Sequence, residues 1–77
     1  MRFSEVLTQI VTEFTGESDR FLIEQFRSIS TSYPELDKEL SSEQAESLIR
    51  RSRDDPKGFI HFLSLGYATV IHQLDHI

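Results

Sequence analysis

Cysteine and tryptophan are absent from this 77-residue chain, which also has only two prolines and three glycines. Without cysteine the protein forms no disulfide, no thiolate zinc site and no cysteine nucleophile. No apolar run approaches the roughly 20 residues of a membrane span. The opening stretch MRFSEVLTQIVTEF places apolar residues at helical spacing and lacks the unbroken apolar core of a signal peptide. These absences predict a soluble protein of the reducing cytoplasm.

Motifs for catalysis and metal binding are also missing. The sequence has no glycine-rich phosphate loop, no nucleophile elbow and no HExxH pair. His61, His72 and His76 share one face of the last predicted helix, and the last two have the i, i+4 spacing of helical metal ligands. A third ligand is missing unless Asp75 or another helix supplies it, so we expect this face to be solvated. We predict that the protein is not an enzyme and holds no metal and no cofactor.

The composition is that of one small globular domain over residues 1–77, with 38% hydrophobic and 27% charged residues. Apolar residues recur at helical spacing, and neither strand-like alternation nor an internal repeat is present. Helices are predicted near residues 4–15, 18–33, 42–53 and 56–75, with a short helical turn near 34–40. We therefore expect an all-α fold, a small four-helix bundle in which the last helix is central.

Each predicted helix has an apolar stripe that its spacing assigns to the core. On the second helix the stripe consists of Leu22, Phe26, Ile29 and Tyr33, with Ile23 beside it. On the last helix the stripe consists of Phe59, Ile60, Leu63, Tyr67, Val70, Ile71, Leu74 and Ile77. Gly66 lies beside this last stripe, where the missing side chain would let another helix approach closely.

Local signals mark where the helices begin and end. Gly16 supplies a stop for the first helix. Ser41 followed by Gln44 three residues later forms a capping box at the start of the third. Asp55 followed by Pro56 is a cap and a first-turn proline, which together predict the start of the last helix.

Charge is unevenly distributed in this chain of net charge −5. Residues 1–46 carry ten acidic and four basic side chains, whereas the remainder carries three acidic and four basic ones. Half of the basic residues lie in the segment RRSRDDPKG, so nucleic-acid binding through Arg50, Arg51 and Arg53 is one alternative function. Carboxylates in and around this segment balance its charge, and Glu46 forms a helix-supporting i, i+4 pair with Arg50. The acidic front half instead favours a basic protein partner.

Three large apolar residues fall outside the main stripes. Phe21 projects away from the stripe of the second helix, and Phe62 and Leu65 lie off that of the last helix. They are either covered by neighbouring segments or exposed as anchors for a partner.

The segments FSEVLTQI, LIEQFRSIS and RDDPKGF occur in that order along the chain. The first is an amphipathic helix, the second matches the pattern L-L/I-E-x-F-x-x-I-T/S, and the third is an acidic turn whose proline opens the final helix. Together they resemble the four-helix immunity proteins that inhibit colicin and pyocin nucleases, although the paired tyrosines and C-terminal tail of that family have no counterpart here. The resemblance implies that Asp19 and Glu24, on the second helix, face a basic nuclease.

These observations predict a small acidic, non-catalytic protein-interaction module, which acts as an immunity-type inhibitor, a chaperone or an adaptor of a basic protein. The candidate contact residues are Asp19, Phe21, Glu24, Phe62 and Leu65. The alternative is a self-associating structural protein, a homodimer whose seam contains Phe62, Leu65 and Phe21.

Overall fold

The computed structural model describes residues 1–75, which form five α-helices and one 3-10 helix. The elements are α1 (Phe3–Val11), α2 (Glu17–Ser32), η1 (Pro34–Leu36), α3 (Ser42–Asp54), α4 (Pro56–Leu63) and α5 (Tyr67–Leu74). No strand forms within these 75 residues, so the predicted all-α class is confirmed. His76 and Ile77, which belong to the histidine face and the last apolar stripe predicted above, lie outside the described residues.

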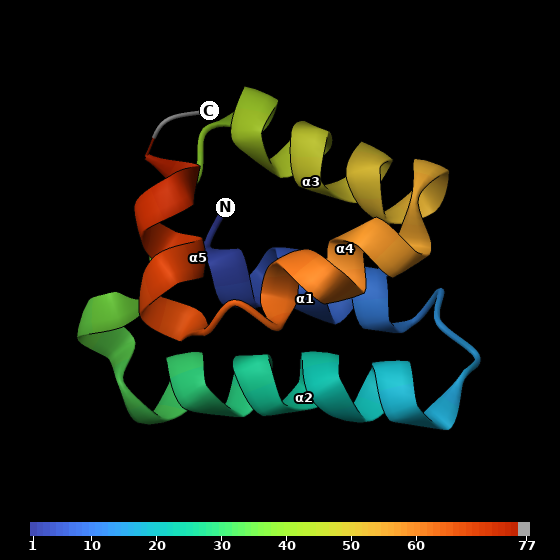
Figure 1. Ribbon diagram of the computed structural model, residues 1–77. Helices are drawn as coiled ribbons and strands as arrows, with labels where there is room; N and C mark the ends of the chain where they lie inside the picture. Colours follow the sequence, from blue (N-terminus) through green and yellow to red (C-terminus); the bar gives the residue numbers. More distant parts are fainter. Residues whose placement is uncertain (76–77) are drawn as a thin grey trace.

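Helices α1 and α4 lie at the centre of the fold, and the other helices pack around them. Figure 1 shows α1 and α2 running antiparallel, joined by the turn after α1, while α3 runs along the opposite edge and α4 returns in front of α1. In the turned view, α4 lies between α3 and α2, and α5 stands across the ends of the other helices. The two central helices are therefore covered on several sides.

The hydrophobic core follows from this arrangement. Five apolar residues of α1, which recur at helical spacing, are buried: Phe3, Val6, Leu7, Ile10 and Val11. The core continues with Ile23, Phe26, Leu40, Ala45, Leu48, Phe59, Phe62, Leu63, Val70 and Leu74. Phe59 contacts Phe62 and Phe14 with ring centroids 6.4 and 6.5 Å apart, so aromatic rings fill the centre.

The stripe predicted for α2 is only partly correct. Ile23 and Ser30 are fully buried, whereas Ile29 is 36% and Tyr33 is 54% exposed. Tyr67, on α5, explains why these side chains are exposed. Its ring packs 5.9 Å from that of Phe26 and occupies the space next to this part of α2. The small Ser30 is the residue buried on this part of α2, and the larger Ile29 and Tyr33 point outward.

The single helix predicted near residues 56–75 is two helices. Gly66 has φ 104° and ψ 149°, which ends the helical path between Leu63 and Tyr67. L-residues rarely adopt this conformation. A Cβ on Gly66 would have no neighbour within 4 Å, so the glycine does not serve the close helix approach that its position on the wheel suggested.

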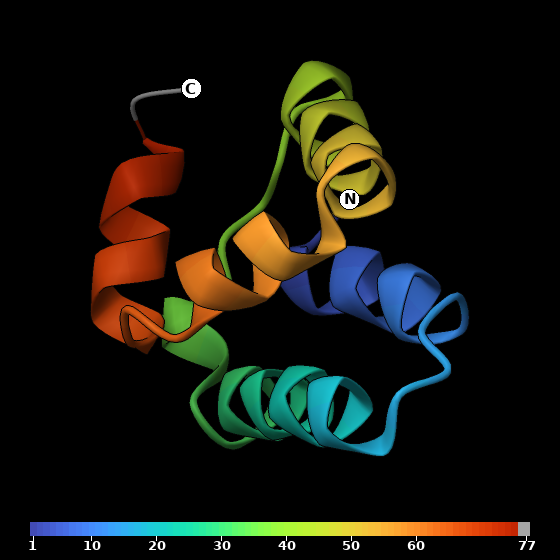
Figure 2. The same ribbon diagram turned by 45° about the vertical axis from the view of Figure 1, so that its right-hand side comes forward.

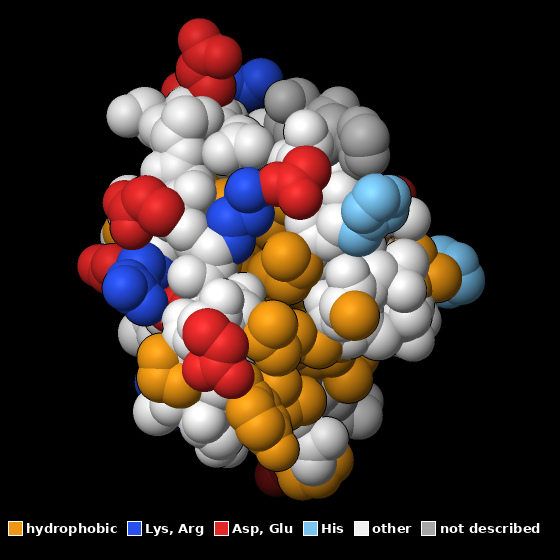
Figure 3. Space-filling model, turned by 90° about the vertical axis from the view of Figure 1, so that its left-hand side faces the viewer, with side chains coloured by type: hydrophobic (Ala, Val, Ile, Leu, Met, Phe, Trp, Pro, Cys, Tyr) orange, Lys and Arg blue, Asp and Glu red, His pale blue; other side chains and the backbone are white. Residues whose placement is uncertain are grey.

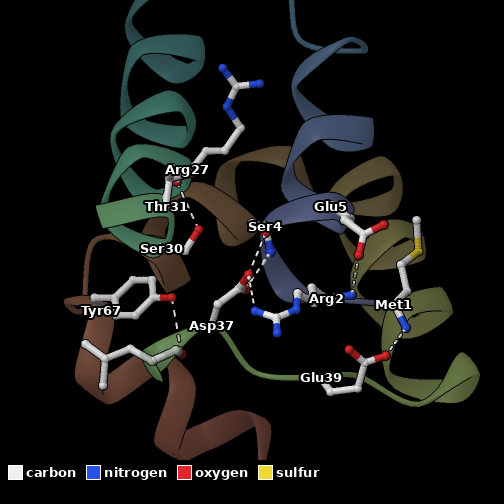
Figure 4. Close-up of polar contacts among 11 residues, drawn as sticks. Met1, Arg2, Ser4, Glu5, Arg27, Ser30, Thr31, Asp37, Glu39 and Tyr67 are labelled. Carbon is white, nitrogen blue, oxygen red and sulfur yellow. Dashed lines mark hydrogen bonds and ion pairs between the residues drawn. The ribbon is translucent and has the colours of Figure 1, made fainter. Parts of the chain in front are cut away.

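The N-terminal residues are tied to the segment after η1. The amide of Phe3 donates to the carbonyl of Lys38 at 2.9 Å, and the amide of Leu40 donates to the carbonyl of Met1 at 2.8 Å. Figure 4 shows Asp37 between Ser4 and Arg2, with its carboxylate accepting hydrogen bonds from the Ser4 amide (3.1 Å) and hydroxyl (2.7 Å). The start of α1 is therefore held by side chains more than thirty residues away in the sequence.

The predicted capping box at α3 is confirmed and provides a stability test. The amide of Gln44 donates to Ser41 Oγ at 3.1 Å, and the amide of Ser41 donates to Gln44 Oε1 at 3.0 Å. We expect Ser41→Ala to lower the free energy of unfolding by about 1 kcal/mol, because an amide at the helix start loses its acceptor. Urea denaturation followed by circular dichroism measures this change. The neighbouring exposed serine gives a matched control, and a loss as large in Ser42→Ala would contradict the role of the cap.

Candidate functional site

Two of the predicted contact residues lie together on the outer surface of α2. Phe21 is 63% exposed, the largest exposed fraction among the large apolar side chains described, and Glu24 is exposed as well. Both belong to a helix of 16 residues, whose backbone hydrogen bonds and buried inner face fix their positions. These two expectations from the sequence therefore meet in one place.

Charged side chains surround Phe21. Glu17 and Glu24, at i−4 and i+3, lie within about 60° of Phe21 around the helix axis, and Arg20 precedes it. Together with Phe21 they line one shallow, open hollow. We call this set of four residues the Phe21 surface. Within residues 1–75 none of its three charged side chains forms an ion pair. Their charges are therefore available to a partner.

Asp19 is not part of this surface. Two residues along a helix correspond to about 200° of rotation, so Asp19 points away from Phe21. Its carboxylate folds back toward Gly16, where a Cβ would lie 3.4 Å from Asp19 Oδ2. It lines a different hollow, on the side where Glu13 and Arg53 meet. The structure thus separates Asp19 from Phe21 and Glu24.

The two candidates from the last predicted helix have different environments. Leu65 is 43% exposed in the turn between α4 and α5. Phe62 is 3% exposed and belongs to the core. The guanidinium of Arg51 lies 4.6 Å from the centre of its ring, a cation–π distance. Phe62 therefore stabilises the fold and offers no surface for a partner or a dimer seam.

Each arginine of the basic segment has a partner inside the protein. Arg50 pairs with Glu46 at 3.2 Å, and Arg51 packs over Phe62. Arg53 makes a two-pronged contact with Glu13, in which Nε donates to Oε2 at 3.1 Å and Nη2 donates to Oε1 at 2.7 Å. This contact raises the pKa of Arg53 and lowers that of Glu13. Phosphate binding would compete with all three of these contacts.

The Glu13–Arg53 pair predicts an acid-sensitive contribution to stability. Since hydrogen bonding to Arg53 holds the pKa of Glu13 below its ordinary 4.5, the folded state binds this proton less tightly than the unfolded state does. The contribution is present above pH 4.5 and is lost as the pH falls through the lowered pKa. We expect the urea midpoint to fall more steeply below about pH 5 in the wild type than in Glu13→Gln. Glu35→Gln, at an exposed carboxylate of η1, should keep the wild-type slope, and equal slopes in all three proteins would contradict this reading.

Sequence reasoning missed an apolar face formed by the end of α2, η1 and α5. Figure 3 shows apolar side chains gathered on the side of the molecule where the end of α2, η1 and α5 lie (Figure 1). Among the large apolar side chains of these elements, Ile29 on α2, Tyr33 just after it and Leu36 in η1 are exposed. The hydroxyl of Tyr67 donates to the Leu36 carbonyl at 3.3 Å, and burial, with the Asp37 carboxylate nearby, raises the pKa of Tyr67. This face could have been found only by knowing that α2 is turned about its axis, so that part of its predicted stripe points outward.

A scan against protein-family models found no match, and searches of the curated proteins and of the solved structures found none either. The function must therefore be inferred from the side chains themselves. Among residues 1–75, no three histidine, cysteine or acidic side chains lie close enough together to hold a metal ion. Within the same residues, no helix is long and apolar enough to cross a membrane.

Proposed function

We propose that this chain is a non-catalytic protein-interaction module that binds a basic protein through the Phe21 surface. The observation that carries the proposal is the 63% exposure of Phe21 between two unpaired carboxylates. Exposed aromatic side chains on rigid elements are favoured binding anchors, because they bury a large area at a small entropic cost. The flanking Glu17 and Glu24 select a partner whose pocket for the ring has a basic rim.

The net charge of the chain also favours a basic partner. An acidic chain of net charge −5 is drawn to a basic partner by long-range attraction, which raises the association rate. The resemblance to immunity proteins supports a basic nuclease of the cytoplasm as the partner that the module would inhibit. A chaperone or adaptor of another basic protein would use the same surface.

The experiment places a photo-crosslinking amino acid, benzoylphenylalanine, at position 21 in cells that express the protein natively. Position 33 serves as the control, because Tyr33 is also an exposed aromatic but lies on the apolar face. We expect one basic protein to be linked from position 21 and not from position 33. The same protein linked equally from both positions, or an acidic one linked from position 21, contradicts the proposal.

Matched variants then measure the contribution of each side chain. Phe21→Ala is expected to weaken binding of that protein about 30-fold, the effect of removing an interface anchor of about 2 kcal/mol. Glu24→Lys should weaken it further, whereas Asp19→Lys, the same charge reversal on the other side of α2, should have a much smaller effect. Titration calorimetry distinguishes these cases. Equal losses from the two charge reversals would indicate only a general electrostatic attraction.

A further inference from the structure

The turn between α4 and α5 interrupts the helix, although the helical spacing of apolar residues continues through it. Phe59, Leu63, Tyr67, Val70 and Leu74 follow one another at intervals of three and four residues, and all but Tyr67 are fully buried. Had the helix continued through Ser64, Leu65 and Gly66, these side chains would still share one face. The helix is interrupted at Gly66, whose φ of 104° is the only positive φ among the described residues.

The residues that hold α5 in place lie far from the turn in the sequence. We call the site that they form the seat of α5. The ring of Tyr67 lies 6.2 Å from that of Phe3 and 5.9 Å from that of Phe26. Gln44 Nε2 donates to the carbonyl of Leu74 at 3.0 Å. Lys38 pairs with Asp75. None of these contacts involves residues 64–66, so the α5 of a second copy would make the same contacts in the same seat.

We propose that two copies of this chain exchange α5, each straightening the turn into one helix from Pro56 to Leu74. Such a helix is about 28 Å long at 1.5 Å per residue. Exchange restores every contact of the seat, because the incoming helix has the same sequence as the one it replaces. The proposal is independent of the proposed function, since the Phe21 surface lies on α2. An exchanged dimer would display two such surfaces.

Local energetics set the balance between the two forms. In the monomer, α5 starts without a side-chain cap at Gly66, and a continuous helix removes that uncapped end. Glycine is a poor residue within a helix and the best residue at positive φ, so Gly66 favours the monomer on both counts. Because exchange needs two molecules, it depends on concentration.

Substitution at position 66 isolates this balance. A Cβ there would touch nothing within 4 Å, so an added methyl group acts only through the backbone. L-alanine disfavours the positive φ and favours the continuous helix, and its effect counts once in each of the two chains. We expect Gly66→Ala to lower the dimer dissociation constant by roughly a thousandfold or more, measured by sedimentation equilibrium. D-alanine, introduced by chemical synthesis, accommodates positive φ and breaks the right-handed helix, so it should raise the dissociation constant.

The existing ion pair distinguishes exchange from any other dimer. A carbodiimide joins the Lys38 amine to the Asp75 carboxylate without a spacer. In the monomer this bond is intramolecular, whereas in the exchanged dimer it joins two chains into a covalent species of twice 9.0 kDa. A mixture of ¹⁴N- and ¹⁵N-labelled protein shows by mass spectrometry which chains are linked. Lys38→Gln should abolish the link.

Each outcome decides the proposal. It is supported if Gly66→Ala forms dimers in which Lys38 and Asp75 are linked between chains. It is overturned if Gly66→Ala stays monomeric up to millimolar concentration, or if it forms dimers whose link is intramolecular. If the L-alanine variant does not fold, wild-type protein refolded at millimolar concentration is crosslinked instead. Linked dimers then support exchange, and linked monomers alone overturn it.

Discussion

Phe59→Ala is expected to lower the free energy of unfolding by about 3–5 kcal/mol, the usual effect of removing a buried aromatic ring. Phe59 is 0% exposed and lies on α4, between the rings of Phe14 and Phe62. Alanine would leave a cavity that helices packed on several sides cannot close. Since small domains have roughly 0.05–0.15 kcal/mol of stability per residue, this loss is a large part of the total.

Urea denaturation at 25 °C, followed by far-ultraviolet circular dichroism, measures the effect. The matched control is Phe21→Ala, the same substitution at a side chain that is 63% exposed, which should change stability by less than about 0.5 kcal/mol. The contrast also establishes that the binding variant Phe21→Ala is correctly folded. Similar losses for the two variants would contradict the burial that separates them.

The parts of the fold that could be predicted from the sequence are those determined locally. The spacing of apolar residues in α1 predicted its buried face, and the serine and aspartate caps predicted where α3 and α4 begin. Helical periodicity and side-chain caps depend on residues within one or two turns, so they are visible in the sequence.

Features that depend on distant partners could not be predicted in this way. The rotation of α2 is decided by Tyr67, which lies 37 positions after Ser30 in the sequence. The break at Gly66 is hidden because the apolar pattern runs through it unchanged. Phe62 lies off the predicted stripe and is still buried, because α4 lies between α3 and α2 and is covered on both sides. A helical wheel identifies the one face with most apolar residues, so it does not show that a second face of the same helix is also covered.

Some residues of the candidate site could likewise be predicted from the sequence, and others could not. The helical wheel alone predicted that Phe21 projects away from the core, because this depends only on where α2 has its buried face. Glu24 came from a resemblance and lies beside Phe21. Asp19 came from the same resemblance and points to the opposite side of the helix. An acidic residue on the right helix is thus insufficient for a site, since its angle around the axis decides what it faces.

Asp37→Ala is expected to lower the free energy of unfolding by about 2–3 kcal/mol, because two donors lose a charged acceptor. The side chain of Asp37 is only 6% exposed and accepts from both the amide and the hydroxyl of Ser4. Its negative charge lies at the start of α1, where the helix dipole favours an anion. Arg2 contributes little, since it is 52% exposed and its Nη1 lies 3.5 Å from the carboxylate.

A double-mutant cycle with Ser4→Ala identifies the contact responsible. If the Asp37 carboxylate acts through the Ser4 hydroxyl, the double variant should be more stable than the sum of the single losses implies, by about 1 kcal/mol or more. Additive losses would indicate that Asp37 acts through the Ser4 amide and the helix dipole alone. Arg2→Ala is the control and should cost less than about 1 kcal/mol. The cycle therefore tests whether the buried carboxylate of Asp37 holds α1 to the segment after η1 through the hydroxyl of Ser4. The sequence alone does not indicate this contact.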